Sequence, residues 1–462
     1  MEQTVTNEIL DILEPIKHDN SIESYQYLNY LPPSSENLNL TGNPITIEIQ
    51  ATDNYHHISK SYLYIEGQLV RADNDQPFAE NTEIALANNA MMHMFQEISY
   101  VIGDKTMEQI SNPGQVTSML GYLIYPDDYN TSSGLMSCWS KDTTPHANSR
   151  KYIASPAVAA NAAIDAGHFT PAENPDYNSG YAARRALLMS SHPRGHFAFA
   201  IPFSHMFGFV EYDKVIYNVK HCLSLKRFSE DNHAIHSAQG VQAGKIKLSK
   251  MIWKVPVVKL NFETLTTIRE SIIEKKKIPV AFSGRNSQST NIPQDVITHD
   301  WKLNVTGGIE KPRWVIVGFQ TDKNRTQQQN SAIFDHLNVK SACVYLNSAV
   351  HYPATGFMSD FELNRYTGHY KDTVDFKENY YNFNSLIGGS QINLSSFKTL
   401  FPIYVFDVRR QSEEIKLGVI NMHMEFNFNN GVPARTYAYA VIISDRFFKL
   451  ASDGKNLTMV TY

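Results

Sequence analysis

Three histidines are the first residues of this sequence whose type and spacing could do chemistry. His192, His196 and His205 lie in SHPRGHFAFAIPFSH, and imidazoles four residues apart can hold a metal ion from one face of a helix. Pro193 and Gly195 disfavour a helix here, and no carboxylate lies close by as a third ligand. We therefore expect solvated or hydrogen-bonded histidines at the start of a strand, with a metal site as the alternative.

Two pairs of carboxylates could supply a general acid and a general base. Asp127 with Asp128, and Asp360 with Glu362, have the composition of a glycosidase pair. Each pair stands among turn-forming or polar residues, where carboxylates ordinarily face water or cap turns. We expect that ordinary role at both places.

A glycine-rich segment, GVQAGK from Gly240 to Lys245, is similar to a phosphate-binding loop. It is one residue short, and Ile246 stands where such a loop needs a hydroxyl for magnesium, so we expect a flexible linker. Nucleophile and zinc-protease signatures (GxSxG, HExxH) do not occur in the sequence. We predict that the protein is not an enzyme, with no catalytic, cofactor-binding or metal-binding residues and no cofactor.

The charge balance argues against a protein that grips nucleic acid. The net charge is −5, the isoelectric point is near 6.4, and the longest basic run is Lys275 to Lys277. One other stretch is locally basic, but a charged row on a strand is usually a solvated face or a guard against edge pairing. Contact with DNA is the alternative for this row, which consists of Lys245, Lys247, Lys250, Lys254 and Lys259.

Cysteines and apolar segments indicate the compartment. Cys138, Cys222 and Cys343 lie far apart without a CxxC pair, which excludes a thiolate zinc site of the usual spacing and favours a reducing compartment. The N-terminal segment MEQTVTNEILDILEPIKHDN is acidic where a signal peptide is basic, and no stretch approaches the roughly 18 apolar residues of a membrane span. We expect a soluble protein made in the cytoplasm.

Hydrophobic periodicity predicts the elements that carry these residues. An N-terminal apolar stripe at roughly helical spacing predicts an amphipathic arm, which covers the protein's own sheet edge or contacts a neighbouring subunit. The stripe consists of Ile9, Leu10, Ile12, Leu13 and Ile16. The period then changes to two, which predicts strands at ITIEIQ (45–50), SYLYIEGQLV (61–70) and HMFQEISYVIGDK (93–105), the last ending in a turn at Gly103-Asp104.

The middle of the chain is expected to be less regular. Polar turn residues interrupt residues 126–196, which we interpret as a long outward loop, and residues 228–243 are interpreted as a linker. A second strand-rich block follows from residue 244, with one helix of ordinary length at about 262–277.

The clearest alternation lies near the end of the chain, in GVINMHMEFNF. Its apolar residues should face a core and its polar residues the outside. The inward set is Met422, Met424, Phe426 and Phe428, and the outward set is Asn421, His423, Glu425 and Asn427. The turn signal NNGVP after them predicts a hairpin with the strand RTYAYAVIISDR.

The composition and the strand pattern together predict the fold class. Aromatic residues make up 11% of the chain and suit the half-buried surface of a sheet. Two strand-rich halves of similar size predict an all-β protein of two tandem jelly-roll β-sandwiches, a double jelly roll, with elaborated loops and a short N-terminal arm. The predicted division is an arm (1–38), a first jelly roll (39–227) with the long loop insertion (126–196), a linker (228–243) and a second jelly roll (244–462).

Several stretches of the second half, in this order, resemble one capsid family. They are WKVPVV (253–258), PRWVIVGFQTDKNRTQQQNSAIFDHL (312–337), VYLNSAVHYP (344–353), FPIYVFDVRRQSEEIKLG (401–418) and YAYAVIISDR (437–446). With them the chain resembles the hexon-like, double jelly-roll major capsid proteins of Polinton (Maverick) elements and adintoviruses. In the first half, MFQEISYVIGDKTMEQI looks like the early strand pair of that family, whereas residues 126–196 match nothing comparable.

The resemblance implies a structural protein of the virion, made in the host cytoplasm. Three chains would form a pseudo-hexagonal capsomer, and capsomers would tile an icosahedral shell around double-stranded DNA, with penton-like and minor capsid proteins as further partners. Such proteins have no active site, cofactor or obligatory metal. Two alternatives stay open: a carbohydrate-binding or glycan-processing jelly-roll protein, and a capsid-derived structural protein that a host has retained.

Overall fold

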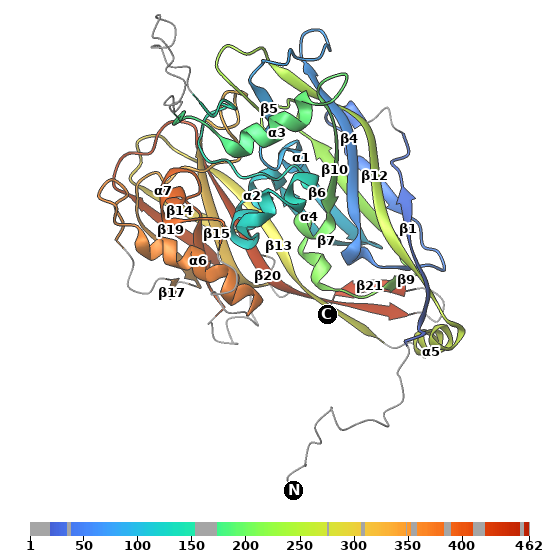
Figure 1. Cartoon of the computed structure of the whole chain (residues 1–462). Helices are drawn as coiled ribbons and strands as arrows, with labels where there is room; N and C mark the ends of the chain where they lie inside the picture. Colours follow the sequence, from blue (N-terminus) through green and yellow to red (C-terminus); the bar gives the residue numbers. More distant parts are fainter. Residues whose placement is uncertain are drawn as a thin grey trace, which may run out of the picture.

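The structure of the chain is a computed structural model, which describes residues 19–34, 38–152, 173–274, 277–305, 310–347, 349–352, 358–382, 390–409, 421–452 and 457–461. The predicted amphipathic stripe at residues 9–16 lies outside this range, as do residues 410–418 of one family-like stretch. Strands predominate, and they form two β-sandwiches that stand side by side (Figure 1). The predicted double jelly roll is confirmed.

The first sandwich consists of two antiparallel sheets. One sheet has the order β8 (His196–Pro202), β4 (Tyr62–Arg71), β12 (Gly244–Leu260), β3 (Tyr55–His56) and β9 (Ile216–Tyr217), with β1 (Ile22–Tyr30) also paired to β12. The facing sheet has the order β2 (Ile45–Ile49), β10 (His221–Arg227), β6 (Phe95–Ile102) and β7 (Lys105–Ser111). The sheets share one core, in which the rings of Tyr100 on β6 and Trp253 on β12 lie 6.1 Å apart.

The second sandwich repeats this plan. Its larger sheet has the order β13 (Ile278–Ile292), β20 (Thr436–Ser452), β15 (Glu310–Thr321) and β18 (Tyr404–Asp407), with β21 (Leu457–Thr461) also paired to β20. The facing sheet has the order β14 (Thr298–Leu303), β19 (Met422–Phe428), β16 (Val339–Leu346) and β17 (Ala349–Tyr352). The rings of Phe319 on β15 and Phe426 on β19 meet edge to face across the core, 5.1 Å apart.

The alternating segments form strands whose predicted faces are buried. β2 and β4 alternate between buried and more exposed residues as expected. On β19, the four apolar residues from Met422 to Phe428 are at most 4% exposed, whereas His423, Glu425 and Asn427 are half-buried and Asn421 is exposed. The predicted turn at Gly103-Asp104 is present and joins β6 to β7 in a hairpin, and Gly103 has a φ of +62° that favours glycine.

The hairpin predicted between GVINMHMEFNF and RTYAYAVIISDR is wrong. β19 pairs with β14 and β16, whereas β20 pairs with β13 and β15 in the opposite sheet. Residues 429–435 therefore turn a corner of the sandwich. The Asn429 side chain donates to the carbonyls of Asn338 and Ser359 at this corner, and Val432 is buried. A strand with one buried face fits either sheet, so alternation alone does not select its partner.

The boundary predicted at residue 244 is also corrected. β12, which the sequence placed in the second jelly roll, pairs with β1, β3 and β4 of the first. The expected linker at 228–243 contains β11 (Ile235–Ser237), a buried strand paired with β5 (Ile84–Leu86). The helix α5 (Phe262–Ile273), which was predicted, connects β12 to β13 and so joins the two halves.

Further helices were not expected, and they pack into the protein. They are α1 (Ala90–His93), α2 (Pro113–Ile124), α3 (Ser179–Met189), α4 (Phe203–Met206), α6 (Thr367–Tyr381) and α7 (Leu394–Thr399). The described part of the expected outward loop is partly core, because Trp139, Asp142 and Arg184 are at most 1% exposed. The loop also contains the short 3-10 helices Asp127–Asn130 and Ser133–Ser137. Some of its polar residues, among them Asp142 and Asn178, form buried hydrogen bonds. Composition alone does not distinguish these residues from polar residues that face water.

Candidate functional site

The three candidate histidines do not form a metal site. His196 is exposed at the start of β8, whereas His205 lies buried in α4 at the other end of that strand, hydrogen-bonded to the Tyr125 hydroxyl (2.6 Å) and to Asn89 Oδ1 (2.8 Å). Burial, with the nearby Arg285, lowers the pKa of His205 to about 3. Across the described residues no group of three His, Cys, Asp or Glu side chains could hold a metal ion.

The residues of the candidate carboxylate pairs bond to other partners in the structure. Asp127 is exposed and accepts from Lys141 Nζ at 2.8 Å. Asp360 caps a turn, because its Oδ1 accepts from the backbone N–H of Glu362 (3.0 Å) and of Leu363 (3.1 Å). Glu362 accepts a hydrogen bond from the side chain of Asn430 instead of pairing with Asp360. Neither arrangement aims two carboxylates at a common substrate.

The glycine-rich segment leads into a strand and does not have the geometry of a phosphate-binding loop. Gly244 begins β12 and is buried, and both of its backbone groups bond to the Gln327 side chain, N–H to Oε1 at 2.8 Å and C=O to Nε2 at 2.7 Å. Gln327 belongs to the second half of the chain, between β15 and β16. The segment is therefore one place where the two halves are joined.

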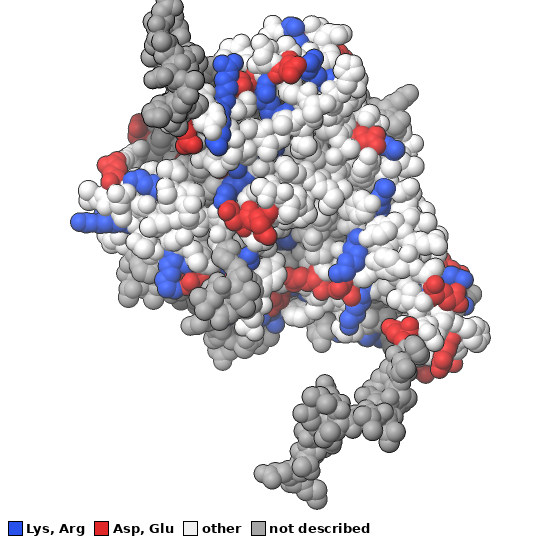
Figure 2. All heavy atoms as spheres, viewed as in Figure 1, with Lys and Arg blue, Asp and Glu red and all other residues white. Residues whose placement is uncertain are grey.

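The basic row on β12 is largely neutralised by neighbours. Lys245 and Lys247 both pair with Asp75, and Lys259 pairs with Glu23 at 2.6 Å. The ammonium of Lys254 lies 5.3 Å from the ring centre of Tyr64. Basic and acidic side chains are interspersed on the face of the molecule that Figure 2 shows. The row is thus a solvated, paired strand face, as expected.

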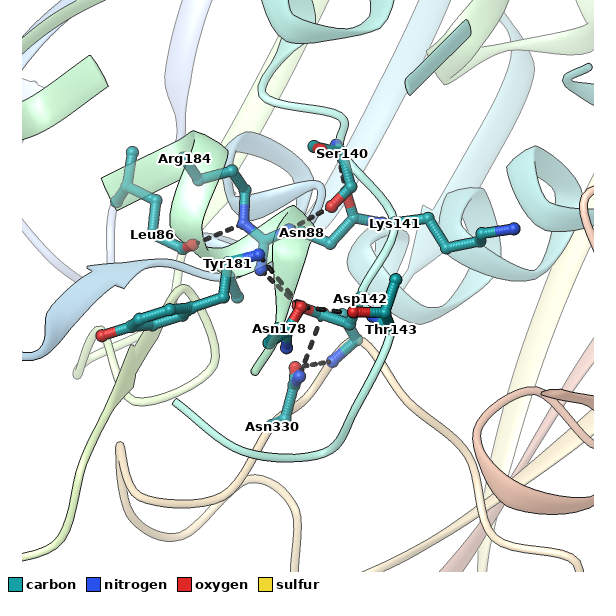
Figure 3. Close-up of polar contacts among 12 residues, drawn as sticks. Leu86, Asn88, Ser140, Lys141, Asp142, Thr143, Asn178, Tyr181, Arg184 and Asn330 are labelled. Carbon is teal, nitrogen blue, oxygen red and sulfur yellow. Dashed lines mark hydrogen bonds and ion pairs between the residues drawn. The ribbon is translucent and has the colours of Figure 1, made fainter. Parts of the chain in front are cut away.

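A buried ion-pair network joins the two halves, and it is the first part of what we call the junction (Figure 3). Asp142 is inaccessible to solvent and accepts from Arg184 Nη2 at 2.6 Å, Asn178 Nδ2 at 2.8 Å and Asn330 Nδ2 at 3.0 Å. Arg184 also donates to the carbonyls of Leu86 and Ser140. Burial by itself would raise the pKa of Asp142, but the Arg184 guanidinium holds that pKa below its usual value.

The elements of this network come from both jelly rolls. Arg184 projects from α3, whose N-cap is Asn178, and Asn178 Oδ1 accepts from the backbone N–H of Tyr181. Asn330 lies in the second half, before β16, and so carries the network across the junction. The Arg184 guanidinium reaches acceptors through its Nε and both of its Nη atoms, which is the condition under which a buried charge is tolerated.

The second part of the junction is a buried carboxylate on β7. Glu108 accepts from the backbone N–H groups of Gly208 (3.1 Å), Phe209 (2.7 Å) and Arg285 on β13 (2.8 Å). The Arg285 guanidinium continues to the carbonyls of Ser204 and His205 in the first half. Burial raises the pKa of Glu108, although Arg285 and Arg446 oppose this.

The backbones of the two halves approach closely at this carboxylate. A Cβ atom added to Gly208 would collide with the carbonyl oxygen of Ser283 on β13, so only glycine permits this contact. The junction therefore combines close backbone packing with buried charge. It can hold two sandwiches in one fixed orientation, and it offers no reacting group to solvent.

Replacing Asp142 with Ala tests the junction. The substitution leaves Arg184 buried without its charge partner, which typically costs about 3–5 kcal/mol of unfolding free energy. The control is Glu23→Ala, since Glu23 pairs with Lys259 at a site where both side chains are exposed (46% and 72%) and such pairs contribute roughly 0–1 kcal/mol. Urea denaturation of both variants measures the two losses, and losses of equal size would contradict the role that we give the network.

Sequence reasoning did not find the junction residues. Asp142, Asn178 and Asn330 come from separate polar stretches that resemble exposed loops, and Arg184 stands in a short helix of modest apolar content. No pattern in the sequence marks them, because the pairing of β12 with the first sheet is known only from the structure.

Comparisons with known proteins agree with this architecture. A family profile described as the Double jelly roll-like domain matches residues 172–448. A chain of the Sputnik virophage, from the cryo-EM structure of that virophage, is 11% identical, with the alignment covering 100% of this chain and 93% of that chain at a TM-score of 0.58. The Faustovirus major capsid protein is 8% identical, with 97% and 93% covered and a TM-score of 0.52.

A search of curated proteins finds no match. At identities this low, the structural likeness establishes the fold. No helix within the described residues is both long and apolar enough to span a membrane. The profile match spans more than half of the chain, so the chain belongs to the double jelly roll-like domain family.

Proposed function

We propose that the chain is a structural major capsid protein that assembles into pseudo-hexagonal homotrimeric capsomers, and that these capsomers tile an icosahedral shell around double-stranded DNA. On the family-like stretches of its second half, we propose an origin in a Polinton (Maverick) element or an adintovirus. Its partners are then further copies of itself, with penton-like and minor capsid proteins, and its location is the virion after synthesis in the host cytoplasm.

The observation that carries the proposal is the rigid pairing of two similar sandwiches in one chain. Each chain supplies two sandwiches held at a fixed angle, so three chains in a ring present six similar corners. Such a ring forms when one interface repeats around a three-fold axis. The buried bonds of Asp142 and Glu108 across the junction support a fixed angle. The Faustovirus protein of the same fold is itself a major capsid protein.

The domain division that we propose follows the sheets. The arm of residues 1–38 includes β1, the first jelly roll extends to the end of β12, α5 replaces the expected linker, and the second jelly roll begins with β13. This moves the predicted start of the second jelly roll from residue 244 to residue 278.

The surface supports self-association better than DNA binding. Among the described strands, β1 pairs with β12 alone, and it exposes Ile22, Tyr25, Tyr27 and Leu28 by 40% or more of their area. An exposed edge strand with apolar side chains is a usual place for contact with another chain. The basic row on β12 is paired with acidic residues, so the chain would enclose DNA without a strong basic binding site.

The purified protein is expected to be a trimer at micromolar concentration, with a mass about three times the 52.4 kDa of one chain. Obligate interfaces of this kind commonly bury about 2,000–5,000 Å², which keeps them closed on dilution. Light scattering after size exclusion gives the mass, and electron microscopy should show particles with a six-cornered outline. A monomer at this concentration would contradict the proposal.

A further inference from the structure

An apolar groove lies at the end of the molecule where the two jelly rolls meet beside α5. We call it the α5 groove; it has a volume of about 430 Å³. Its lining comes from elements of both halves, including Tyr55 (β3), Tyr217 (β9), Ile268 and Ile272 (α5), Ile278 (β13), Leu450 (β20) and Leu457 (β21). Figure 1 shows α5, β9 and β21 together at this end.

The N-terminal segment of the chain enters the described structure next to this groove. The carbonyl of Ser21 accepts from the backbone N–H of Asn261, the N-cap of α5, at 3.0 Å. α5 rises 1.5 Å per residue, so Ile268 lies about 10 Å and Ile272 about 16 Å along the helix from that contact. Ser21 lies five residue steps after Ile16, and extended chain spans at most about 3.5 Å per step, roughly 17 Å in all.

The apolar stripe and the groove also match in chemistry. The stripe offers five aliphatic side chains, from Ile9 to Ile16, to a groove lined almost wholly by aliphatic and aromatic ones. Before Lys17 the segment carries acidic residues and no basic ones; these are Glu2, Glu8, Asp11 and Glu14. Charge adds nothing to this match, because basic residues (Lys214, Arg269, Lys277) and acidic residues (Asp53, Glu270, Glu274) both stand around the groove.

We propose that the apolar stripe of residues 9–16 docks in the α5 groove of its own chain. The arm then crosses α5, which connects the two jelly rolls, and contacts both jelly rolls. These contacts add to the junction in holding the two jelly rolls together. Burial of several Leu and Ile side chains removes enough apolar area from water to hold the arm. This inference does not depend on the capsid proposal.

Cysteine crosslinking of the full-length protein tests the docking and identifies the occupant. In a Cys222→Ser, Cys343→Ser background, Leu13→Cys is combined with Ile268→Cys in the groove, and as a control with Glu263→Cys on the exposed first turn of α5. Glu263 lies nearer to Ser21 along α5 than Ile268 does, so an arm without a docking site would crosslink there at least as fast. A docked arm raises the local concentration of the thiol introduced at position 13, and we expect crosslinking at least about 10-fold faster with position 268.

The outcomes separate the possible occupants. A crosslink within one chain, identified on a denaturing gel and by peptide mass, supports the proposal. A crosslink between chains overturns it in favour of arm exchange between copies, and equal rates at positions 268 and 263 overturn docking altogether. The mass of the uncrosslinked protein is measured on the same samples, so failure of the trimer and failure of the docking are distinguished.

A second readout does not need new cysteines. Leu13→Asp places a charge in the stripe, whereas Asn7→Asp adds the same charge outside it. We expect amide hydrogen exchange in α5 to rise about 10-fold in Leu13→Asp and to stay unchanged in Asn7→Asp, because only the first loses the apolar contact. Unchanged exchange in Leu13→Asp would overturn the proposal.

Discussion

Replacing Phe426 with Asp is expected to abolish soluble protein. Phe426 is fully buried on β19, between β14 and β16, and its ring meets Phe319 of the opposite sheet. Loss of a core Phe costs about 3–5 kcal/mol, and an unpaired buried carboxylate costs several more. Since a folded domain is stable by only about 5–15 kcal/mol, the sum removes most or all of the stability.

The neighbouring substitution Asn427→Asp is the matched control. It adds the same charge one residue away, on the half-buried outer face, where Asn427 bonds to Ser341 and Glu425. The lost bonds and the repulsion from Glu425 cost roughly 1–2 kcal/mol, so the variant should stay soluble. The soluble fraction after expression measures both variants. Equal solubility would show that the two faces of β19 are assigned wrongly.

Prediction from sequence succeeded where the information is local. The strands β2, β4 and β19 follow from the alternation of their side chains, because period two places one set on a core and the other outside. The turn at Gly103-Asp104 was predicted from its two residues, and in the structure this turn pairs the consecutive strands β6 and β7. The helix expected at about 262–277 is α5, which begins at Phe262 after its N-cap Asn261 and ends at Ile273.

Prediction failed where the information is not local. β12 has the same pattern whether it pairs with β4 or with a strand of the second half, and only the full fold decides between them. β19 and β20 looked like a hairpin, yet a seven-residue corner carries the chain into the facing sheet. Register and partner depend on contacts between distant residues, which periodicity does not record.

The junction was beyond prediction for a related reason. Its parts are polar residues, and polar residues in turn-rich stretches ordinarily face water. Asp142 and Asn330 are buried because their hydrogen bonds satisfy each other across the two halves. These hydrogen bonds can be recognised only when the positions of both halves in the fold are known. The absence of catalytic signatures, by contrast, could be read directly from the sequence.

Acidification from pH 7 to pH 5 is expected to destabilise the protein steeply. Seven histidines lie in or near the core, and burial lowers the pKa of each from its ordinary 6.5 to about 3 or about 4. They are His56, His93, His205, His221, His233, His236 and His369. As the pH falls, the unfolded chain binds protons at these sites and the folded chain does not. The contribution of these histidines to the free energy of unfolding is therefore fully present above pH 6.5 and is lost as the pH falls toward 4.

The size of the effect follows from the same linkage. At pH 5, a histidine whose pKa falls from 6.5 to about 4 has lost about 2 kcal/mol of stability, so seven of them lose on the order of 10 kcal/mol. Glu108 opposes part of this, because its raised pKa makes the folded state bind a proton more readily as the pH falls. Asp142 adds nothing in this window, since its lowered pKa matters only below the ordinary carboxylate range. The loss rivals the whole stability of a domain.

Urea denaturation at several pH values between 7 and 5 measures the slope of the unfolding free energy. His221→Asn should reduce that slope by up to about 1.4 kcal/mol per pH unit, because it removes one proton from the difference between unfolded and folded states. His196→Asn is the control, since His196 is exposed at the start of β8 and should leave the slope unchanged. His221 is fully buried against Tyr100, whose hydroxyl lies 2.9 Å from its Nδ1, so protonation there places a charge beside a neutral partner. A flat profile of the unfolding free energy from pH 7 to 5 would mean that water or a charge partner reaches these histidines. The packing that we describe for the first sandwich would then be wrong.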